Sequence, residues 1–188
     1  MKYFVSGALS LMLLSCSQPS AEKMLAEKIQ KDITLHQVDS MARAVIGQGL
    51  NAGSGYSQIW ARDMNTFIEV ACEETDHQVL RQAILLFFAL QQPNDEMIDG
   101  YVLKPEFTWY DDTPYYSDAA PDHVAFKNTV ETDQETSLIQ IVGKYIRKTG
   151  DKSILSENVA GRTVLERMDD MVDYLMRERY SEKYGLIY

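Results

Sequence analysis

The chain has 188 residues, of which 45% are hydrophobic, an ordinary proportion for a globular protein. Its formal net charge of −10 at pH 7 argues against a nucleic-acid partner, which needs a basic surface, and against electrostatic attachment to anionic lipid. A neutral ligand such as a sugar is compatible with this charge.

The N-terminal residues have the pattern of a secretion signal. Lys2 precedes an apolar run from Tyr3 to Leu14. A membrane span takes about 20 residues, so this shorter run predicts the hydrophobic region of a signal peptide.

The end of the run, Leu13-Leu14-Ser15-Cys16, resembles the bacterial lipobox, in which the cysteine becomes the lipidated first residue after cleavage. We therefore expect a lipoprotein signal peptide at residues 1–15, lipidation of Cys16 and a polar tether at residues 16–22. The protein would then be lipid-anchored in the bacterial cell envelope, facing the periplasm or the cell surface. The alternative is an ordinary secretory signal with an incidental cysteine.

Apolar residues recur at helical spacing from Glu22 onward, which predicts helical structure up to the glycine-rich segment 47–55. These residues are Leu25, Ile29, Ile33, Val38, Met41, Ala42 and Val45. In the glycine-rich segment the backbone can turn sharply and approach a ligand closely.

A second helix is expected to start near Ala61. One of its faces is apolar and carries Met64, Phe67, Ile68 and Ala71. With Cys16 lipidated, Cys72 is the one cysteine that keeps a free side chain, so it has no partner for an internal disulfide. It lies within an apolar helical face, and we expect it to be a small buried hydrophobe.

A third helix is predicted from about Asp76 to Gln91. Over residues 83–90 it is apolar on every side. That pattern predicts burial between neighbouring elements, and Pro93 stops the helix.

The next segment, residues 94–130, shows little periodicity. Irregular segments of this length are usually functional or disordered, and its aromatic content argues against disorder. Either the aromatic side chains of this segment form the rim of a binding site and stack on sugars, or the segment is a long irregular loop that packs on the outside of the domain. The aspartate spacing matches no EF-hand calcium loop, and we expect no metal site. The aromatic residues and aspartates of the segment are Tyr101, Phe107, Trp109, Tyr110, Tyr115, Tyr116, Phe126, Asp95, Asp99, Asp111, Asp112, Asp118 and Asp122.

A fourth helix has a predicted capped start, with Thr132 as the N-cap and Glu135 closing a capping box. Gly150 suits the position just after its last residue. Its apolar face carries Leu138, Ile141, Val142 and Tyr145.

A fifth helix is expected from about Arg162 to Tyr180. The side chains predicted to face inward are Leu165, Met168, Val172 and Leu175. No segment gives a convincing strand signal. The expected fold class is therefore all-α, with long antiparallel helices joined alternately by short and long loops.

Trp60-Ala61-Arg62-Asp63 places three ligand-binding side chains at the start of the second helix. Arg62 offers a fork of donors, Asp63 a pair of acceptors and Trp60 an apolar face. Sugar hydroxyls need both donors and acceptors, and the C–H face of a sugar ring stacks on an indole. The alternative interpretation is an Arg–Asp pair that caps a helix beside a core tryptophan.

The helix alternation and this motif together resemble the six-hairpin, (α/α)6-barrel glycosidases, which include glucoamylases, glucosidase-type trimming enzymes and amylo-1,6-glucosidases. In that family a Trp-x-Arg-Asp motif opens an early inner helix, and its Arg and Asp grip the non-reducing-end sugar. Residues 131–136 resemble the segment that opens the next inner helix, and residues 144–151 resemble the exit from that helix. The resemblance covers roughly Ile33 to Tyr188.

The resemblance implies a partial (α/α)6 toroid of antiparallel helical hairpins over residues 23–188, as the N-terminal part of a glycosidase domain. It implies an inverting glycoside hydrolase that acts on the non-reducing ends of oligosaccharides, with α-linked gluco-oligosaccharides as substrates and no cofactor. The sugar-binding residues would be Trp60, Arg62 and Asp63, with Asp133 and Gln134 as further candidates.

In the glucoamylase pattern the catalytic acid and base follow later inner helices. We therefore expect the chain to be an incomplete, inactive part of such an enzyme, with no catalytic residue of its own. Glu131, Asp133 and Glu135 are acidic, but the dipole at a helix start explains their position. The alternative function is a non-catalytic, lipid-anchored glycan-binding protein of an uptake system. The oligomeric state stays open.

Overall fold

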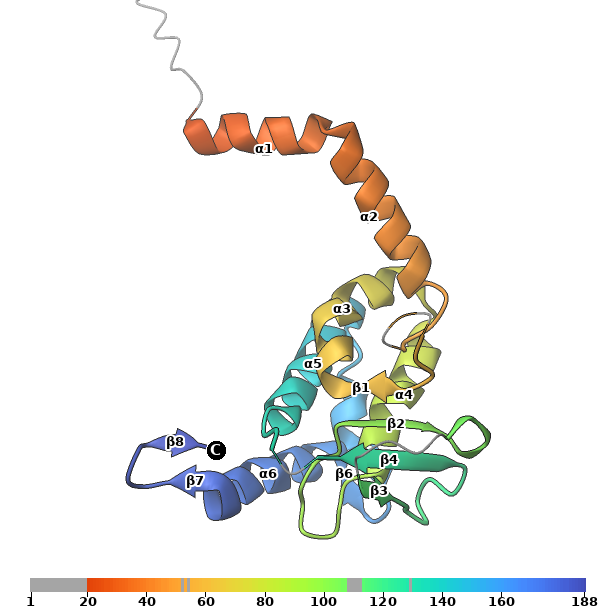
Figure 1. The fold of residues 1–188 in the computed structure, drawn as a ribbon, viewed down its shortest axis with the longest axis vertical. Coiled ribbons are helices and arrows are strands. Elements are labelled where there is room, and N and C mark those ends of the chain that lie inside the picture. Colours follow the sequence, from red (N-terminus) through yellow and green to blue (C-terminus); the bar gives the residue numbers. More distant parts are fainter. Residues whose placement is uncertain (1–19, 52, 54, 108–112, 129) are drawn as a thin grey trace, which may run out of the picture. The chain divides into compact units, whose positions relative to one another are not determined.

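The structure is a computed structural model that describes residues 20–188 apart from residues 52, 54, 108–112 and 129 (Figure 1). The described residues divide into two units, one that ends at residue 39 and one that starts at residue 40. The expected lipidation site, Cys16, and most of the expected tether lie outside the described residues.

The first unit contains helix α1 (Ala21–Lys31) and the first part of α2 (Ile33–Ile46). Ser20 caps α1 by accepting a hydrogen bond from the backbone N of Lys23 at 3.3 Å. Asp32 lies between the helices in an extended conformation, and its carboxylate accepts from the backbone N of Thr34 at 2.9 Å. The predicted helical pattern is confirmed, but Asp32 divides it into two helices.

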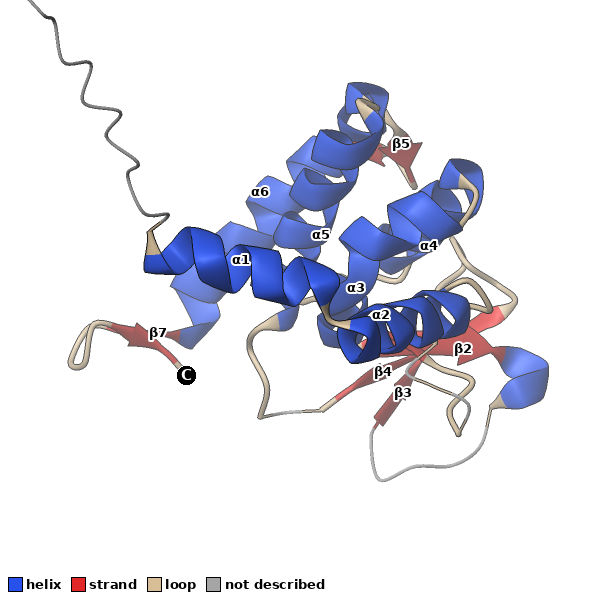
Figure 2. Cartoon of the chain, turned by 90° about the horizontal axis from the view of Figure 1, so that it is seen from above, coloured by secondary structure: helices blue, strands red, loops and turns tan. Residues whose placement is uncertain are grey.

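Helices dominate the second unit, shown in blue in Figure 2. Its four longer helices are α3 (Ala61–Glu74), α4 (His77–Ala89), α5 (Gln134–Thr149) and α6 (Val164–Tyr174). Short helices are η1 (Lys104–Glu106), η2 (Lys152–Ser156) and the π-helical η3 (Leu175–Arg179) that continues α6. The second to fifth helices expected from the sequence are confirmed, with ends that differ by a few residues.

Helices α3 and α5 lie side by side and run parallel (Figure 1). Side chains near the start of α3 contact side chains near the start of α5, and those near the two helix ends contact each other. The pairs are Arg62 with Asp133, Asn65 with Lys144, Glu69 with Arg147, and Glu73 with Lys148. A parallel pair places the two helix N-termini at the same end of the unit.

The core of the second unit lies between these helices and the sheet described below. The predicted apolar faces of α3 and α5 are confirmed, and Cys72 is buried as expected. The stretch 83–90 of α4 has no exposed residue, as its all-round apolar pattern predicts. The largest fully buried side chains are Tyr145, Phe87, Phe88, Phe126, Met64, Ile68, Leu80, Ile84, Leu90, Met97, Ile98 and Leu138.

The chain is rich in helix, as the all-α prediction requires, but the expectation of a fold without strands is wrong. A four-stranded antiparallel sheet has the order β1-β2-β4-β3. Its strands are β1 (Ile59–Trp60), β2 (Gly100–Leu103), β3 (Thr113–Tyr115) and β4 (His123–Lys127). They have two to five residues each, and β2 and β4 are buried on both faces for most of their length, so no alternation of polar and apolar residues marks them.

Two further strand pairs are short hairpins. They join β5 (Asn158–Val159) to β6 (Arg162–Thr163) and β7 (Tyr180–Ser181) to β8 (Leu186–Ile187). The second hairpin begins where the predicted fifth helix was expected to end.

The inward face predicted for the fifth helix is half wrong. Leu165 and Val172 are 49% and 43% exposed, whereas Met168 packs partly buried against the core and Leu175, the first residue of η3, is buried. The buried residues of α6 are Val164, Arg167, Met171 and Tyr174. A hydrophobicity pattern does not predict this buried face, because the face includes a charged residue, Arg167.

Gly100 allows β1 to pair with β2. A Cβ atom there would lie 2.6 Å from the carbonyl oxygen of Ile59 and 2.9 Å from the Trp60 ring. We expect Gly100→Ala to lower the free energy of unfolding by about 1–3 kcal/mol, the usual cost of overpacking. Urea denaturation followed by circular dichroism measures this change.

Gly143 in α5 provides the matched control, because its added Cβ would meet no atom closer than 3.8 Å. Gly143→Ala should leave stability unchanged or raise it by about 0.5–1 kcal/mol, since alanine favours a helix over glycine. Equal effects of the two substitutions would contradict the steric explanation.

Candidate functional site

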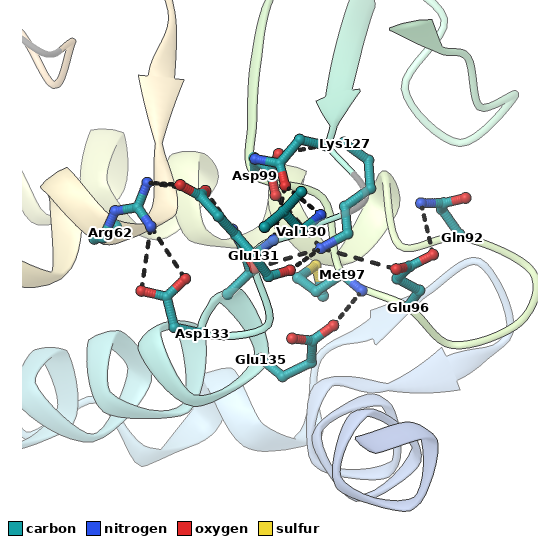
Figure 3. A network of polar contacts seen from close by, with 12 residues as sticks. Arg62, Gln92, Glu96, Met97, Asp99, Lys127, Val130, Glu131, Asp133 and Glu135 are labelled. Carbon is teal, nitrogen blue, oxygen red and sulfur yellow. Dashed lines mark hydrogen bonds and ion pairs between the residues drawn. The ribbon is translucent and has the colours of Figure 1, made fainter. Parts of the chain in front are cut away.

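Arg62 joins the starts of α3 and α5 (Figure 3). Its Nη2 donates to Oε1 and Oε2 of Glu131 at 2.8 and 2.9 Å, and its Nη1 donates to Oδ1 and Oδ2 of Asp133 at 3.2 and 3.3 Å. The three side chains are 50%, 34% and 48% exposed in the order Arg62, Glu131, Asp133. We call these residues the Arg62 clamp.

The clamp combines donors and acceptors on a solvent-accessible surface. The hydrogen bond from Arg62 holds the pKa of Glu131 below its ordinary value, so this carboxyl is ionised at neutral pH. The guanidinium can donate hydrogen bonds to the hydroxyl groups of a sugar, and the two carboxylates beside it can accept hydrogen bonds from them.

Backbone contacts at the start of α3 fix the position of Arg62. Trp60 is the N-cap of α3, with an extended backbone and no side-chain capping bond. The backbone N of Ala61 donates to the carbonyl oxygen of Asp99 at 2.8 Å, which ties the start of α3 to the start of β2. Arg62 therefore projects from the first turn of a helix whose entry is held by the sheet.

The predicted capping box at Thr132 and Glu135 is wrong. The N-cap of α5 is Asp133, which makes no side-chain capping bond. Glu135 is 1% exposed, and its Oε1 accepts from the backbone N of Met97 at 2.9 Å. Glu135 has a buried tertiary partner instead of a capping one.

The chain does form a capping box, but at the start of α6. There the Thr163 hydroxyl accepts from the backbone N of Glu166, and the Glu166 carboxylate accepts from the backbone N of Thr163. Thr163 and Glu166 thus form the threonine–glutamate capping box that was predicted for Thr132 and Glu135.

Asp63 points to a different neighbour from Arg62. It lines a cavity of about 190 Å³ together with Asn51, Gly49, Gly53 and Phe67. Asn51 holds this loop closed by donating from Nδ2 to the carbonyl oxygens of Gly53, at 3.0 Å, and of Tyr56. The glycine-rich segment therefore lines the same cavity as Asp63.

Trp60 lies against the sheet. Its ring is 5.8 Å from that of Phe126 between centroids, on the face of the sheet that also carries Val102 and Val124. The ring is partly buried there. The expected trio therefore divides, since Trp60 contacts the sheet, Arg62 contacts α5 and Asp63 faces the loop.

Gln134 is buried, with 1% of the residue exposed. Its Nε2 donates to Oε2 of Glu131 at 3.1 Å, and its Oε1 accepts from Nζ of Lys127 at 3.4 Å. The structure thus connects both predicted residues to Arg62, Asp133 directly and Gln134 through Glu131. Glu131 and Lys127 were not among the predicted binding residues, although Glu131 opens the motif that carries the resemblance.

Two carboxyl groups behind the clamp are buried. Burial raises the pKa of Asp99 to about 6, although Lys127 and a hydrogen bond from the backbone of Asn128 lower it. Burial also raises the pKa of Glu135, whose Oε2 has no hydrogen-bond partner among the described residues. These groups face the interior and not the accessible side of the clamp.

The raised pKa of Asp99 makes a pH-dependent contribution to stability. Its folded pKa of about 6 exceeds its ordinary 3.8, so the contribution is full below pH 4 and is lost as the pH rises through 6. At about 1.4 kcal/mol per pKa unit, the loss is about 3 kcal/mol. We expect Asp99→Asn to remove it, so that the variant gains about this much unfolding free energy relative to wild type between pH 4 and 7.

Urea denaturation at several pH values measures this difference. The exposed Asp118 gives the control, because a side chain on the surface is not desolvated and Asp118→Asn should change stability far less than Asp99→Asn does. A pH-independent difference for Asp99→Asn would contradict the assignment.

Part of the expected aromatic rim lies outside the described residues, namely Trp109, Tyr110, Asp111 and Asp112. Among the rim residues that the structure describes, Tyr101 and Phe126 are buried, whereas Tyr116 is 53% exposed. Tyr101, Tyr115 and Phe126 lie in strands β2, β3 and β4 and contribute to the hydrophobic core.

Other possible sites are distinct from the clamp. A larger, mainly apolar cavity of about 720 Å³ lies between α4 and β2 and is lined by residues such as Ala83, Leu86 and Tyr101. Within the described ranges, no cluster of three or more His, Cys, Asp or Glu residues is placed to hold a metal ion. The helices of the described chain are too short or too polar to span a membrane.

Comparisons with protein-family models, with curated proteins and with solved structures found no match to this chain. The function of the chain is therefore inferred from the motif, from the family that the motif resembles and from the geometry of the clamp.

Proposed function

We propose that this chain supplies part of the sugar-binding subsite of an inverting glycoside hydrolase that acts on the non-reducing ends of α-linked gluco-oligosaccharides. The observation that carries the proposal is the Arg62 clamp, which gathers a guanidinium and two carboxylates where two parallel helices begin. Asp63, beside the glycine-rich loop, adds a further acceptor pair on the next residue of α3.

The arrangement of helices supports the same proposal. In an (α/α)6 toroid the inner helices run parallel to one another and each is followed by an outer helix that returns. Helices α3 and α5 are parallel neighbours with α4 between them in sequence, as two inner helices and one outer helix would be. The lipid anchor at Cys16 belongs to this proposal and would attach the protein to the cell envelope.

One observation favours the alternative of a glycan-binding protein without catalysis. An inverting hydrolase needs a carboxylic acid that stays protonated near the glycosidic oxygen and a base about 6.5–9.5 Å away. Among the described carboxyl groups, those with a raised pKa are Asp99 and Glu135, and both are buried. The clamp by itself is therefore suited to hold a sugar and not to protonate one.

Ligand-observed NMR with maltotriose, isomaltotriose and cellotriose tests sugar binding by the 188-residue chain. We expect saturation transfer to the α-linked sugars and none to cellotriose. Asp63→Asn should weaken binding by about tenfold or more, since a hydrogen bond to a charged group contributes about 1.5–3 kcal/mol.

Asp173→Asn, at an exposed position on α6, is the matched control and should bind as the wild type does. Measurement of free glucose in the same samples separates binding from hydrolysis. Absence of binding to every trisaccharide, or unchanged binding in Asp63→Asn, would overturn the proposal.

A further inference from the structure

Lys127 stands behind the clamp with its ammonium group buried. Its side chain is 9% exposed. Nζ donates to the carbonyl oxygen of Glu131 at 3.0 Å and to Oε1 of Gln134 at 3.4 Å. It also lies 3.4 Å from Oδ1 of Asp99 and 3.8 Å from Oε1 of Glu96 (Figure 3). This lysine cannot reach a ligand on the accessible side, so any influence on the site passes through its partners.

Two routes lead from Lys127 to the clamp. The first is direct, because Lys127 holds the backbone carbonyl of Glu131. The second passes through Gln134, whose amide oxygen faces Lys127 and whose amide nitrogen therefore faces Oε2 of Glu131. Arg62 holds that same carboxylate.

The loop that carries Glu131 is fixed by the same group of residues. Asp99 Oδ2 accepts from the backbone N of Asn128 at 2.6 Å, and Asn128 Oδ1 accepts from the backbone N of Val130 and of Glu131 at 2.9 and 2.8 Å. Asp99 in turn faces Lys127. Removing the ammonium group would leave buried acceptors without their donor, which costs more than losing an exposed contact.

We propose that Lys127 is a positioning residue for the Arg62 clamp. Its ammonium group orients the Gln134 amide and anchors the Glu131 backbone, so that the Glu131 carboxylate stays in place to receive Arg62. The role of the clamp in sugar binding rests on the proposed function, whereas the positioning of Arg62 is a property of the chain that can be measured without a sugar.

The ¹⁵N NMR spectrum of the arginine guanidinium groups tests the positioning. Two bound carboxylates should slow rotation of the Arg62 guanidinium and give resolved Nη signals, assigned by their absence in Arg62→Ala. In Lys127→Met this rotation should become about tenfold faster or more, the factor that corresponds to losing one hydrogen bond to a charged group. Lys127→Arg should restore slow rotation at least in part.

Arg162 is the internal control, because it also bridges two carboxylates, those of Asp95 and Asp170. Its guanidinium signals should be the same in every variant. Unchanged Arg62 rotation in Lys127→Met, or equal loosening of Arg62 and Arg162, would overturn the proposal.

A second variant covers the case in which Lys127→Met fails to fold. Gln134→Leu keeps the lysine, is close in volume and removes only the amide route, so it should speed up Arg62 rotation by a smaller factor. Slow rotation in that variant would refute the amide route.

Maltotriose titration of the same variants separates the two proposals. If Lys127 positions a sugar-binding clamp, Lys127→Met should weaken binding and Lys127→Arg should recover part of it. If the wild type binds no saccharide, the proposed function fails, while the guanidinium spectra still decide whether Lys127 positions Arg62.

Discussion

Arg62→Ala is expected to weaken maltotriose binding by about 10- to 100-fold, the range that corresponds to a charge-assisted hydrogen bond of about 1.5–3 kcal/mol. The substitution removes donors from the accessible surface. It also leaves the carboxylates of Glu131 and Asp133 side by side without the guanidinium that separates them, so the pKa of Glu131 should rise towards its ordinary value. NMR titration of the folded variant measures the binding change.

Stability should change little in the same variant. The Arg62 side chain is 50% exposed, and ion pairs this exposed contribute about 1 kcal/mol or less. Arg162→Ala provides the matched control, since it removes another arginine that bridges two carboxylates but lies away from the clamp. Sugar binding that falls equally in both variants, or in neither, would contradict a specific role for Arg62.

Arg167→Ala is expected to lower the free energy of unfolding by about 3–5 kcal/mol, because it leaves buried hydrogen-bond acceptors unpaired and truncates a large buried side chain. Arg167 is 5% exposed. Its Nε and Nη2 donate to the carbonyl oxygen of Val159 at 2.9 and 2.8 Å, and its Nη1 donates to Oε1 of Gln91 at 2.9 Å. The variant would leave these buried acceptors unpaired and open a cavity between α6, α4 and the β5–β6 hairpin.

Urea denaturation followed by circular dichroism measures this loss. Arg147→Ala serves as the control, because Arg147 is 65% exposed and its contact with Glu69 is 3.7 Å long. Its removal should change stability by less than about 0.5 kcal/mol. Equal losses of stability in the two variants would show that the burial of Arg167 does not determine its contribution to the free energy of unfolding.

The sequence by itself determined the helices whose pattern is strong. The apolar faces of α3 and α5 follow from residues such as Met64 and Leu138, because the side chains at helical spacing that avoid water must share one side. Gly150 ends α5 in the left-handed conformation, at φ 76°, as its place after the last helical residue predicts. The motif at Trp60–Asp63 was also found correctly at the start of a helix.

Tertiary structure decided the strands and the contacts of the clamp. Strands of two to five residues acquire their hydrogen bonds from partners far along the chain, as β2 does from β4, so no local pattern predicts them. Glu135 was predicted to cap α5, but it is buried and accepts a hydrogen bond from the backbone of Met97. The buried face of α6 includes Arg167, a charged residue that a hydrophobicity pattern does not assign to the core.

The same division holds for the site. Residue types at a predicted helix start indicated Arg62 and Asp63, and the family resemblance added Asp133 and Gln134. Only the parallel packing of α3 and α5 brought Arg62 to Glu131 and Asp133, which are 69 and 71 residues away. Pairing over such distances depends on how whole helices pack, and that is a property of the assembled core, which no local stretch of sequence encodes.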